Sequence, residues 1–260
     1  MSANWEDLKP RVLSGVAMIV VGLMTVWLGG LWFHALIGLI SGLMVWELVR
    51  MLDPERRTEA LMLGGLAALV SFLAPHLPAA VALPLLLAPS MVGLGRMGRG
   101  GVTYGVFTAL ILLAGFGMTG LRDDFGLLWM LWLVLVVVVT DVAGYFAGRM
   151  IGGPKFWPRV SPKKTWSGTV AGWIAAAVVG LIFAQWTVAG AGLAGVSVAI
   201  SMASQLGDVA ESAIKRRCGV KDSSSLIPGH GGLLDRFDGM LGASVFLVIA
   251  GQIIGFPPGP

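Results

Sequence analysis

The sequence has 260 residues with a formal net charge of +4, and 56% of the residues are hydrophobic while only 12% are charged. A soluble domain would carry about 25% charged residues, so the composition excludes a soluble globular protein. Apolar runs of membrane-spanning length recur along the chain and predict an all-α, polytopic integral membrane protein. The single cysteine, Cys218, excludes an internal disulfide and argues against a metal–thiolate site.

Breaks at glycine, proline and charge clusters divide the chain into nine predicted membrane helices. In chain order they cover residues 12–29, 31–49, 60–74, 79–94, 102–121, 126–149, 168–187, 192–215 and 237–256. Only Gly29 and Gly30 separate the first two helices, so a tight hairpin is expected there. The N-terminal stretch MSANWEDLKPR leads into a long apolar run without a small-residue cleavage site, which predicts an uncleaved first span. The spacings GLISG (38–42) and GYFAG (144–148) are typical of close helix packing.

The basic residues predict the orientation of the chain. With the N-terminus in the cytoplasm, 17 of the 18 Lys and Arg residues fall in cytoplasmic loops or helix ends, and only Arg122 falls outside. We therefore expect about nine spans, a cytoplasmic N-terminus and a periplasmic C-terminus. Basic residues spread along one membrane face, without a recognisable nucleic-acid module, predict no nucleic-acid partner.

The chain is expected to have two functional parts. Residues 1–121 would form a packing part that faces lipid, and residues 122–260 would carry two cytoplasmic loops, 150–168 and 216–236, that hold the chemistry. With their helix ends, these loops contain ten of the cytoplasmic basic residues. Orientation alone does not require this density, so the loops are candidate binding elements.

Carboxylates lie beside these loops, inside apolar helices. Asp141 falls late in the sixth predicted helix, and Asp208 and Glu211 fall in the eighth. A charged side chain within a span costs about 2.5–3.5 kcal/mol on insertion scales, so it usually faces a cavity, an ion or a partner. For Glu211, an ion pair with Lys215 on the same helix face is an equally good explanation.

Two sets of polar residues share helix faces. One set steps by four, three and four along the eighth predicted helix: Ser204, Asp208, Glu211 and Lys215. In the other, Asp235 and Asp238 are three residues apart at the start of the ninth helix. A simpler alternative is that Asp235 is the N-cap of this helix and that Asp238, in its first turn, interacts favourably with the helix dipole. This alternative leaves the adjacent GHGG and Arg236 unexplained.

Acids from two helices beside Lys and Arg are typical of a site for a magnesium-bound phosphate. Mg²⁺ bridges carboxylates to substrate phosphates, and basic side chains neutralise the remaining phosphate oxygens. Gly229, Gly231 and Gly232 would let backbone N–H groups approach a phosphate at the start of the ninth helix. The residues alone predict a membrane enzyme that handles phosphorylated substrates at its cytoplasmic face.

Residues 212–238, SAIKRRCGVKDSSSLIPGHGGLLDRFD, resemble the signature of the phosphatidate cytidylyltransferases. SPKKTW (161–166) and SQLGDVAES (204–212) resemble two further blocks of that family, and length and span number agree over essentially the whole chain. The resemblance implies that CTP and phosphatidate give CDP-diacylglycerol and pyrophosphate with Mg²⁺, and leaves a second metal or a monovalent ion open. It also implies a homodimer in the bacterial inner membrane that acts in phospholipid biosynthesis.

The resemblance also implies residue roles. The expected metal ligands are Asp208, Asp235 and Asp238, with Asp141 as a further candidate. The expected catalytic residues are Asp208, Asp235, Lys215 and Arg236. The residues expected to bind CTP or the lipid headgroup are Ser161, Lys163, Lys164, Thr165, Ser204, Arg216, Lys221, Asp222, His230, Gly231 and Gly232. For His230, ordering of its loop is an equal alternative, and His34 and His76 are expected to be incidental.

One position departs from the family pattern, because Ser167 stands where the block commonly continues with Glu. Either that acid is not essential, or another acid such as Asp141 covers its role. Two other activities stay as alternatives: a CTP-dependent polyprenol- or phytol-type lipid kinase, and a secondary transporter that uses intramembrane acids. The full pattern from K-D to D-R-x-D favours cytidylyl transfer, and the lack of an internal repeat disfavours a transporter.

Overall fold

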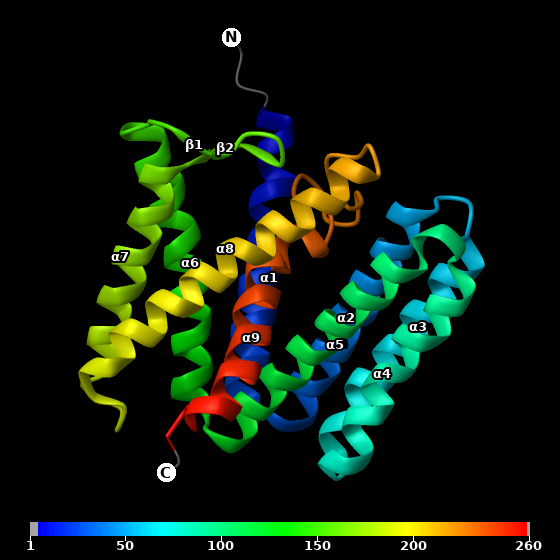
Figure 1. The fold of residues 1–260 in the computed structure, drawn as a ribbon, viewed down its shortest axis with the longest axis horizontal. Helices are drawn as coiled ribbons and strands as arrows, with labels where there is room; N and C mark the ends of the chain where they lie inside the picture. Colours follow the sequence, from blue (N-terminus) through cyan, green and yellow to red (C-terminus); the bar gives the residue numbers. More distant parts are fainter. Residues whose placement is uncertain (1–4, 259–260) are drawn as a thin grey trace. The chain divides into compact units, whose positions relative to one another are not determined.

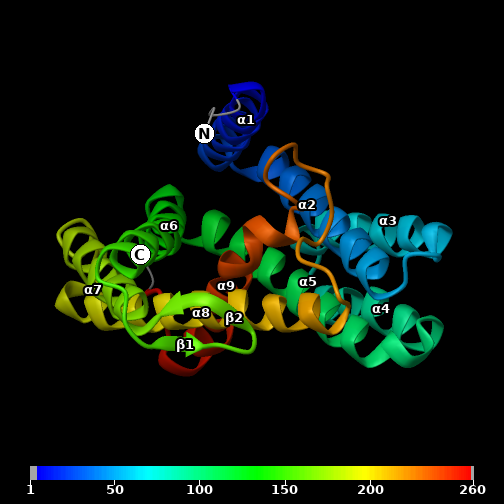
Figure 2. The same ribbon diagram turned by 90° about the horizontal axis from the view of Figure 1, so that it is seen from above.

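The computed structural model describes residues 5–258, without the side chains of residues 5–9 and 79. Within this part the chain forms nine α-helices and one short antiparallel hairpin (Figures 1 and 2). Eight helices of the described part are long and apolar enough to cross a membrane, and the apolar helix at Ala80–Arg96 is shorter. The prediction of an all-α, multi-pass membrane protein is confirmed. The two chain ends, predicted to lie on opposite sides of the membrane, fall outside the described residues, and the exact number of spans stays a prediction.

The chain divides into two compact units, Met1–Asp123 with Cys218–Phe237, and Asp124–Arg217 with Asp238–Pro260. The first unit contains α1 (Trp5–Leu28), α2 (Gly30–Leu52), α3 (Arg57–Leu73), α4 (Ala79–Arg96) and α5 (Gly101–Asp124). Short 3-10 turns follow α3 at Ala74–His76 and precede α5 at Gly98–Gly100. The second unit contains α6 (Leu127–Met150), β1 (Lys155–Trp157), β2 (Ser161–Thr165), α7 (Trp166–Phe183), a 3-10 turn (Gly190–Gly192), α8 (Leu193–Arg217) and most of α9 (Leu234–Ile254).

A tight turn joins α1 to α2, as the Gly29–Gly30 pair predicts. Gly29 has a φ of 65°, a conformation that costs glycine little and strains other residues. Arg122 reaches this turn from α5, where Nε donates to the carbonyl of Val26 at 2.6 Å and Nη2 to that of Trp27 at 3.0 Å. Arg122 therefore caps the last carbonyls of α1, which explains a basic residue at this end of the helices.

Small residues set the packing of α2 against α3. A Cβ on Gly42 would lie 2.6 Å from Cβ of Ala68, and one on Gly38 would lie 3.0 Å from the Ala68 carbonyl oxygen. Gly64 on α3 approaches Gly42 in return, at 2.8 Å from its carbonyl oxygen. The interpretation of GLISG as a packing motif is confirmed.

A buried histidine cluster ties together three segments of the first unit. His34 of α2 places Nε2 2.6 Å from Oδ2 of Asp123 and Nδ1 3.3 Å from Nε2 of His76. The His34 side chain is buried, so these contacts satisfy polar atoms that water does not reach. The two histidines expected to be incidental therefore hold α2, α5 and the Ala74–His76 turn together.

The second unit is built on close contacts between α6, α7 and α8. A Cβ on Gly168 of α7 would lie 2.5 Å from the carbonyl oxygen of Gly144, so GYFAG also packs as predicted. Polar bonds cross from α6 to α8, since Trp132 Nε1 donates to Ser197 Oγ at 2.9 Å and Thr140 Oγ1 to Ser201 Oγ at 2.8 Å. These buried bonds fix the rotation of α8 and hence the direction of its polar face.

Helices α8 and α9 cross in near contact within the second unit. A Cβ on Gly207 would lie 2.3 Å from the carbonyl oxygen of Asp238, and one on Gly242 would lie 2.2 Å from that of Ala203. Only glycine permits this approach of two backbones. Helix α9 starts at Leu234, three residues before the predicted start at 237, and this shift places Asp235 inside the helix.

Candidate active site

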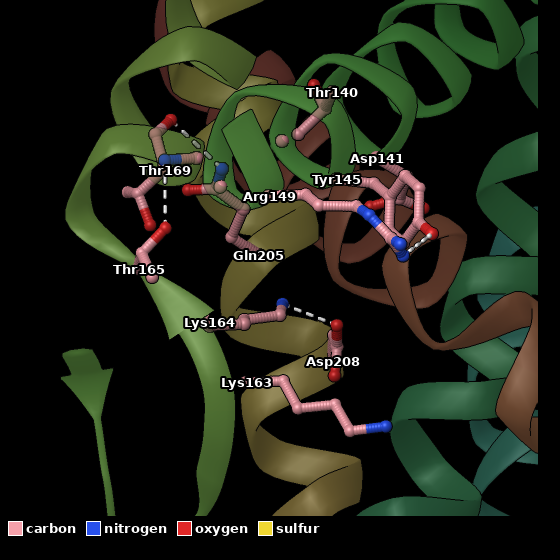
Figure 3. Close-up of a pocket in the computed structure, with 13 residues that line it drawn as sticks. Thr140, Asp141, Tyr145, Arg149, Lys163, Lys164, Thr165, Thr169, Gln205 and Asp208 are labelled. Atoms are coloured by element: carbon pink, nitrogen blue, oxygen red, sulfur yellow. Dashed lines mark hydrogen bonds and ion pairs between the residues drawn. The ribbon is translucent and has the colours of Figure 1, made fainter. Parts of the chain in front are cut away.

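A cavity of about 610 Å³ lies in the second unit, bordered by α6, β2, α7 and α8 (Figure 3). Its volume falls within the range of about 300–1,000 Å³ that is usual for small-molecule sites. Its lining residues are Thr140, Asp141, Gly144, Tyr145, Gly148, Arg149, Lys163, Lys164, Thr165, Gly168, Thr169, Gln205 and Asp208. The cavity thus collects cations from β2 and α6, and carboxylates from α6 and α8.

The loop predicted between the sixth and seventh helices contains the β1–β2 hairpin. Lys155 pairs with Thr165 and Trp157 with Ser161, and the ring of Phe156 packs 4.8 Å from that of Trp166. Lys163 and Lys164 are consecutive residues of β2, and both line the cavity. Lys163 is exposed, and Lys164 is half-buried in the cavity (Figure 3).

Thr165 and Ser167 anchor the hairpin to the start of α7. Thr165 is buried and caps the helix, since Oγ1 accepts a hydrogen bond from the Gly168 N–H at 3.3 Å. Ser167 Oγ donates to the Gly152 carbonyl and lies 3.0 Å from Oγ1 of Thr165. Ser167, where an acid was expected from the resemblance, is therefore a structural bridge between the end of α6 and the start of α7.

An ion pair between Lys164 and Asp208 spans the cavity (Figure 3). The Lys164 side chain is 25% exposed and that of Asp208 is 28% exposed, and Ser212 Oγ also donates to Asp208 Oδ1 at 3.2 Å. Partly hydrated ion pairs contribute little net stability. The pair is therefore able to exchange its partners for those of a charged ligand at small cost.

The polar face predicted along α8 is present, and much of it is buried. Ser204 and Glu211 are 1% and 2% exposed. Lys215 Nζ lies 2.5 Å from Oε2 of Glu211, so the alternative reading of this pair as a buried ion pair is confirmed. Glu211 holds the Lys215 ammonium against the helix, and Lys215 remains a predicted catalytic residue.

Three carboxylates of the second unit interact electrostatically. Asp141 and Asp208 repel Asp238, and Lys215 attracts it. Carboxylate oxygens are the donors that Mg²⁺ prefers, and Mg²⁺ commonly takes only one or two of them with water and substrate phosphate. Among the described residues no group of three or more His, Cys, Asp or Glu is arranged to hold an ion by itself. The donor set therefore fits an ion that a phosphate ligand helps to bind.

The signature stretch of the first unit is folded around Asp235. Its Oδ2 accepts hydrogen bonds from the backbone N–H of Ser223 and of Gly232, both at 2.8 Å, and from Ser223 Oγ at 2.9 Å. Because α9 begins at Leu234, the simpler alternative of an N-cap role for Asp235 is wrong, and this acid instead organises the loop from the first turn of the helix.

His230 makes contacts that order its loop. Nδ1 lies 2.9 Å from Oγ of Ser14 on α1, and Arg236 Nε donates to the His230 carbonyl at 3.0 Å. Ser14 Oγ also lies 3.1 Å from the Pro228 carbonyl oxygen. These contacts favour the loop-ordering interpretation of His230.

Comparison with known proteins identifies the family. Residues 9–254 match the model of the cytidylyltransferase family. The chain belongs to this family. A phosphatidate cytidylyltransferase of Brucella suis biovar 1 (strain 1330) is 36% identical over 263 residues, covering 98% of this chain and 97% of the relative. Those of Bacillus subtilis (strain 168) and Helicobacter pylori (strain J99) are 33% and 31% identical, covering 93% and 90% of this chain and 96% and 88% of the relatives.

This cytidylyltransferase places the predicted site residues in three settings. The cavity of the second unit holds Asp141, Lys163, Lys164, Thr165 and Asp208. Elsewhere in that unit are Ser161 at the start of β2, Ser204, Lys215 and exposed Arg216 on α8, and Asp238 on α9. The first unit holds Lys221, Asp222, His230, Gly231, Gly232, Asp235 and Arg236. The chemical roles assigned to these residues stay predictions.

Three polar residues with structural roles in the two units escape the sequence reasoning: Gln205 and Arg149 of the second unit, and Glu47 of the first. Gln205 lines the cavity, accepts a bond from Trp173 Nε1 at 3.0 Å and donates to the Thr169 carbonyl at 3.2 Å. Arg149 donates to the Tyr145 hydroxyl at 3.1 Å beside the same cavity. Glu47 of α2, in the stretch MVWELVR, is fully buried against residues 218–233 between α8 and α9, the signature loop. Glu47 is a single acid within an apolar predicted span, and this pattern alone would have marked it as a candidate functional residue.

Cys218 begins the signature loop but is not a candidate nucleophile. Burial raises the pKa of its thiol, because the charged thiolate is poorly solvated there. A raised pKa leaves the thiol protonated at neutral pH, and the thiolate is the nucleophilic form.

Proposed function

We propose that this chain is a phosphatidate cytidylyltransferase that converts CTP and phosphatidate to CDP-diacylglycerol and pyrophosphate. Family membership and the near-complete coverage of relatives bearing that name support the proposal. The observation that carries it within the molecule is the Lys164–Asp208 pair in a cavity of about 610 Å³, with Lys163 and Arg149 beside it. Such a site matches a polyanionic nucleotide better than an apolar ligand.

The chemistry requires one new bond and one broken bond. An oxygen of the phosphatidate phosphate attacks the α-phosphorus of CTP, and the bond from that phosphorus to the oxygen bridging to the β-phosphate breaks. Pyrophosphate leaves with the electron pair of the broken bond. Because the attacking oxygen is already anionic, the enzyme needs no base to activate it and supplies positioning and charge neutralisation.

The ion pair suggests how the cavity accepts its ligand. Lys164 and Asp208 neutralise each other in the structure, and each remains about a quarter exposed. A phosphate oxygen would replace Asp208 as the partner of Lys164, which frees the Asp208 carboxylate for a cation. Lys163 and Arg149 would neutralise further phosphate oxygens at the rim.

Magnesium is the proposed cofactor, and it would supply divalent charge that bridges carboxylates and phosphate oxygens. Asp208, Asp238 and Asp141 are the carboxylates of the second unit that would hold it, with the substrate completing the ligand set. Asp235 stays a predicted ligand, although its Oδ2 already accepts three hydrogen bonds from the loop. A second metal or a monovalent ion remains open.

We also propose that the enzyme is a homodimer of the bacterial inner membrane, with the cavity facing the cytoplasm. The one-sided distribution of basic residues supports this orientation. The relatives come from bacteria, which is consistent with the proposed location in a bacterial inner membrane. The dimer rests on the family resemblance.

A turnover assay tests the proposal. Purified protein in mixed micelles receives CTP labelled at the α-phosphate and either phosphatidate or a polyprenol, with Mg²⁺ or with a chelator. We expect label in the lipid phase only with phosphatidate and Mg²⁺. Formation of CDP with the polyprenol would instead identify a lipid kinase, and neither product from folded protein would favour the transporter.

A further inference from the structure

We propose that Glu47 of α2 is a positioning residue for cytidylyl transfer, because it clamps the signature loop and the start of α9 through four hydrogen bonds. This inference rests on the proposed function, since it assigns a task to the loop that carries the family signature. The residue lies in the first unit with all of its partners, although 176 to 187 positions separate it from those it contacts across the chain.

Both carboxylate oxygens of Glu47 are used. Oε1 accepts from Ser224 Oγ at 2.6 Å and from the Leu233 N–H at 2.9 Å. Oε2 accepts from the Leu234 N–H at 2.7 Å and from Ser223 Oγ at 3.3 Å. Glu47 and Leu234 are both 0% exposed, so water does not replace these bonds.

The chemistry of the donors requires a carboxylate at this position. A backbone N–H only donates, and one such group faces each oxygen of Glu47. An ionised carboxylate accepts at both oxygens, whereas the amide of glutamine would turn an NH₂ group toward one of the two N–H donors. Glutamine has nearly the same volume, so it isolates the loss of acceptance from a loss of packing.

Glu47 also accounts for Gly232 of the PGHGG motif. A Cβ at position 232 would lie 2.6 Å from Glu47 Oε1 and 2.0 Å from Ser223 Oγ. The motif therefore needs a residue without a side chain where the Glu47 carboxylate meets the loop. The same carboxylate occupies the N–H groups at the start of α9, where a phosphate was expected to bind.

The clamp reaches Asp235 through Ser223. The Ser223 hydroxyl lies 3.3 Å from Glu47 Oε2 and 2.9 Å from Asp235 Oδ2, and the Gly232 N–H also donates to Asp235. Loss of Glu47 would release Leu233 and Leu234 on one side of Gly232, and Ser223 and Ser224 on the other. Asp235 would then lose its fixed orientation, without any contact between Glu47 and a substrate.

The test combines kinetics with hydrogen exchange on the full-length protein in micelles. We expect Glu47→Gln to lower kcat by about 100-fold, the cost of displacing a catalytic group by about 1 Å, with a smaller change in the KM for CTP. Amide exchange in the peptide that contains residues 232–235 should become at least about tenfold faster, because two N–H groups lose a charged acceptor. The midpoint of Mg²⁺ activation should also rise.

Ser41→Ala is the matched control. Ser41 is also buried on α2 and receives a hydrogen bond from Ser71 at 3.3 Å, but this bond lies within the helix pair and not at the loop. This variant should keep wild-type kcat and loop exchange. If Glu47→Gln does not fold, Ser224→Ala removes one donor from the clamp and should lower kcat by about three- to tenfold.

Three results would decide against the clamp. One is a Glu47→Gln enzyme with kcat and loop exchange equal to those of Ser41→Ala. Another is a loss of kcat with unchanged exchange in residues 232–235, and the third is wild-type behaviour of Ser224→Ala when Glu47→Gln fails to fold. A wild-type protein without cytidylyl transfer would overturn the proposed function, and the exchange data would still show whether Glu47 holds the loop.

Discussion

Asp208→Asn separates a catalytic role from a structural one. Asparagine keeps the size of the side chain and an oxygen that accepts from Ser212, but it removes the charge that pairs with Lys164. At 25% and 28% exposure the ion pair is worth about 0–1 kcal/mol, so stability should change little. In a chain of this size about 1 kcal/mol shifts Tm by about 2–4 °C. We therefore expect a Tm within about 4 °C of the wild type.

Activity should respond far more strongly. Asp208 is proposed to hold the cation that neutralises the reacting phosphate, and loss of one preorganised charge-stabilising group costs about 100- to 1,000-fold in kcat, or about 2.7–4 kcal/mol. The assay is release of pyrophosphate from CTP and phosphatidate, with thermal unfolding measured in the same micelles. Asp124→Asn is the control, because it removes the same charge from an exposed side chain away from the cavity.

Two results would refute this reasoning. If Asp208→Asn keeps near-normal kcat, Asp208 is not part of the reaction site. If Tm falls by about 10 °C and activity falls in parallel, the Asp208 carboxylate stabilises the second unit. The Lys164–Asp208 ion pair would then contribute much more to stability than about 1 kcal/mol.

Three further predictions follow from the same geometry. Lys164→Gln should raise the KM for CTP by about tenfold or more, measured by initial rates, because a phosphate loses a charge-assisted partner; an unchanged KM would place CTP elsewhere. Gly168→Ala should lower the free energy of unfolding by about 1–3 kcal/mol in denaturant titrations, since its Cβ would lie 2.5 Å from the Gly144 carbonyl oxygen. Gly195→Ala, with nothing within 4 Å of the new Cβ, should be neutral or stabilising, and equal effects would contradict the close packing. A chelator should abolish turnover and added Mg²⁺ should restore it, and full activity in the chelator would remove magnesium from the scheme.

The helices follow from local sequence patterns, and most of their limits lie within a few residues of those predicted. Long apolar runs must form helices in a bilayer, because no water satisfies their backbone polar groups. The start of α9 was less predictable. Leu233 and Leu234 donate to Glu47, a residue far away in the sequence, so the helix begins before the apolar run would place it.

Neither the β1–β2 hairpin nor the contacts of Glu47 with the signature loop could be predicted from local sequence patterns. Strands β1 and β2 have three and five residues and lack the apolar alternation that marks a strand. Glu47 shows no motif of its own, and its importance lies in partners from another part of the chain. By contrast, the Glu211–Lys215 pair was predictable as an alternative, because both residues share one helix turn.

The measurement that tests the central claim most directly is the fate of two labels in CTP. One label marks the α-phosphate and another the γ-phosphate, and phosphatidate is the acceptor in the presence of Mg²⁺. The account predicts equal amounts of the α-label in the lipid and of the γ-label in pyrophosphate. With Asp208→Asn, neither label should move from CTP into these products. Recovery of the γ-label in the lipid would contradict cytidylyl transfer and show phosphoryl transfer in its place.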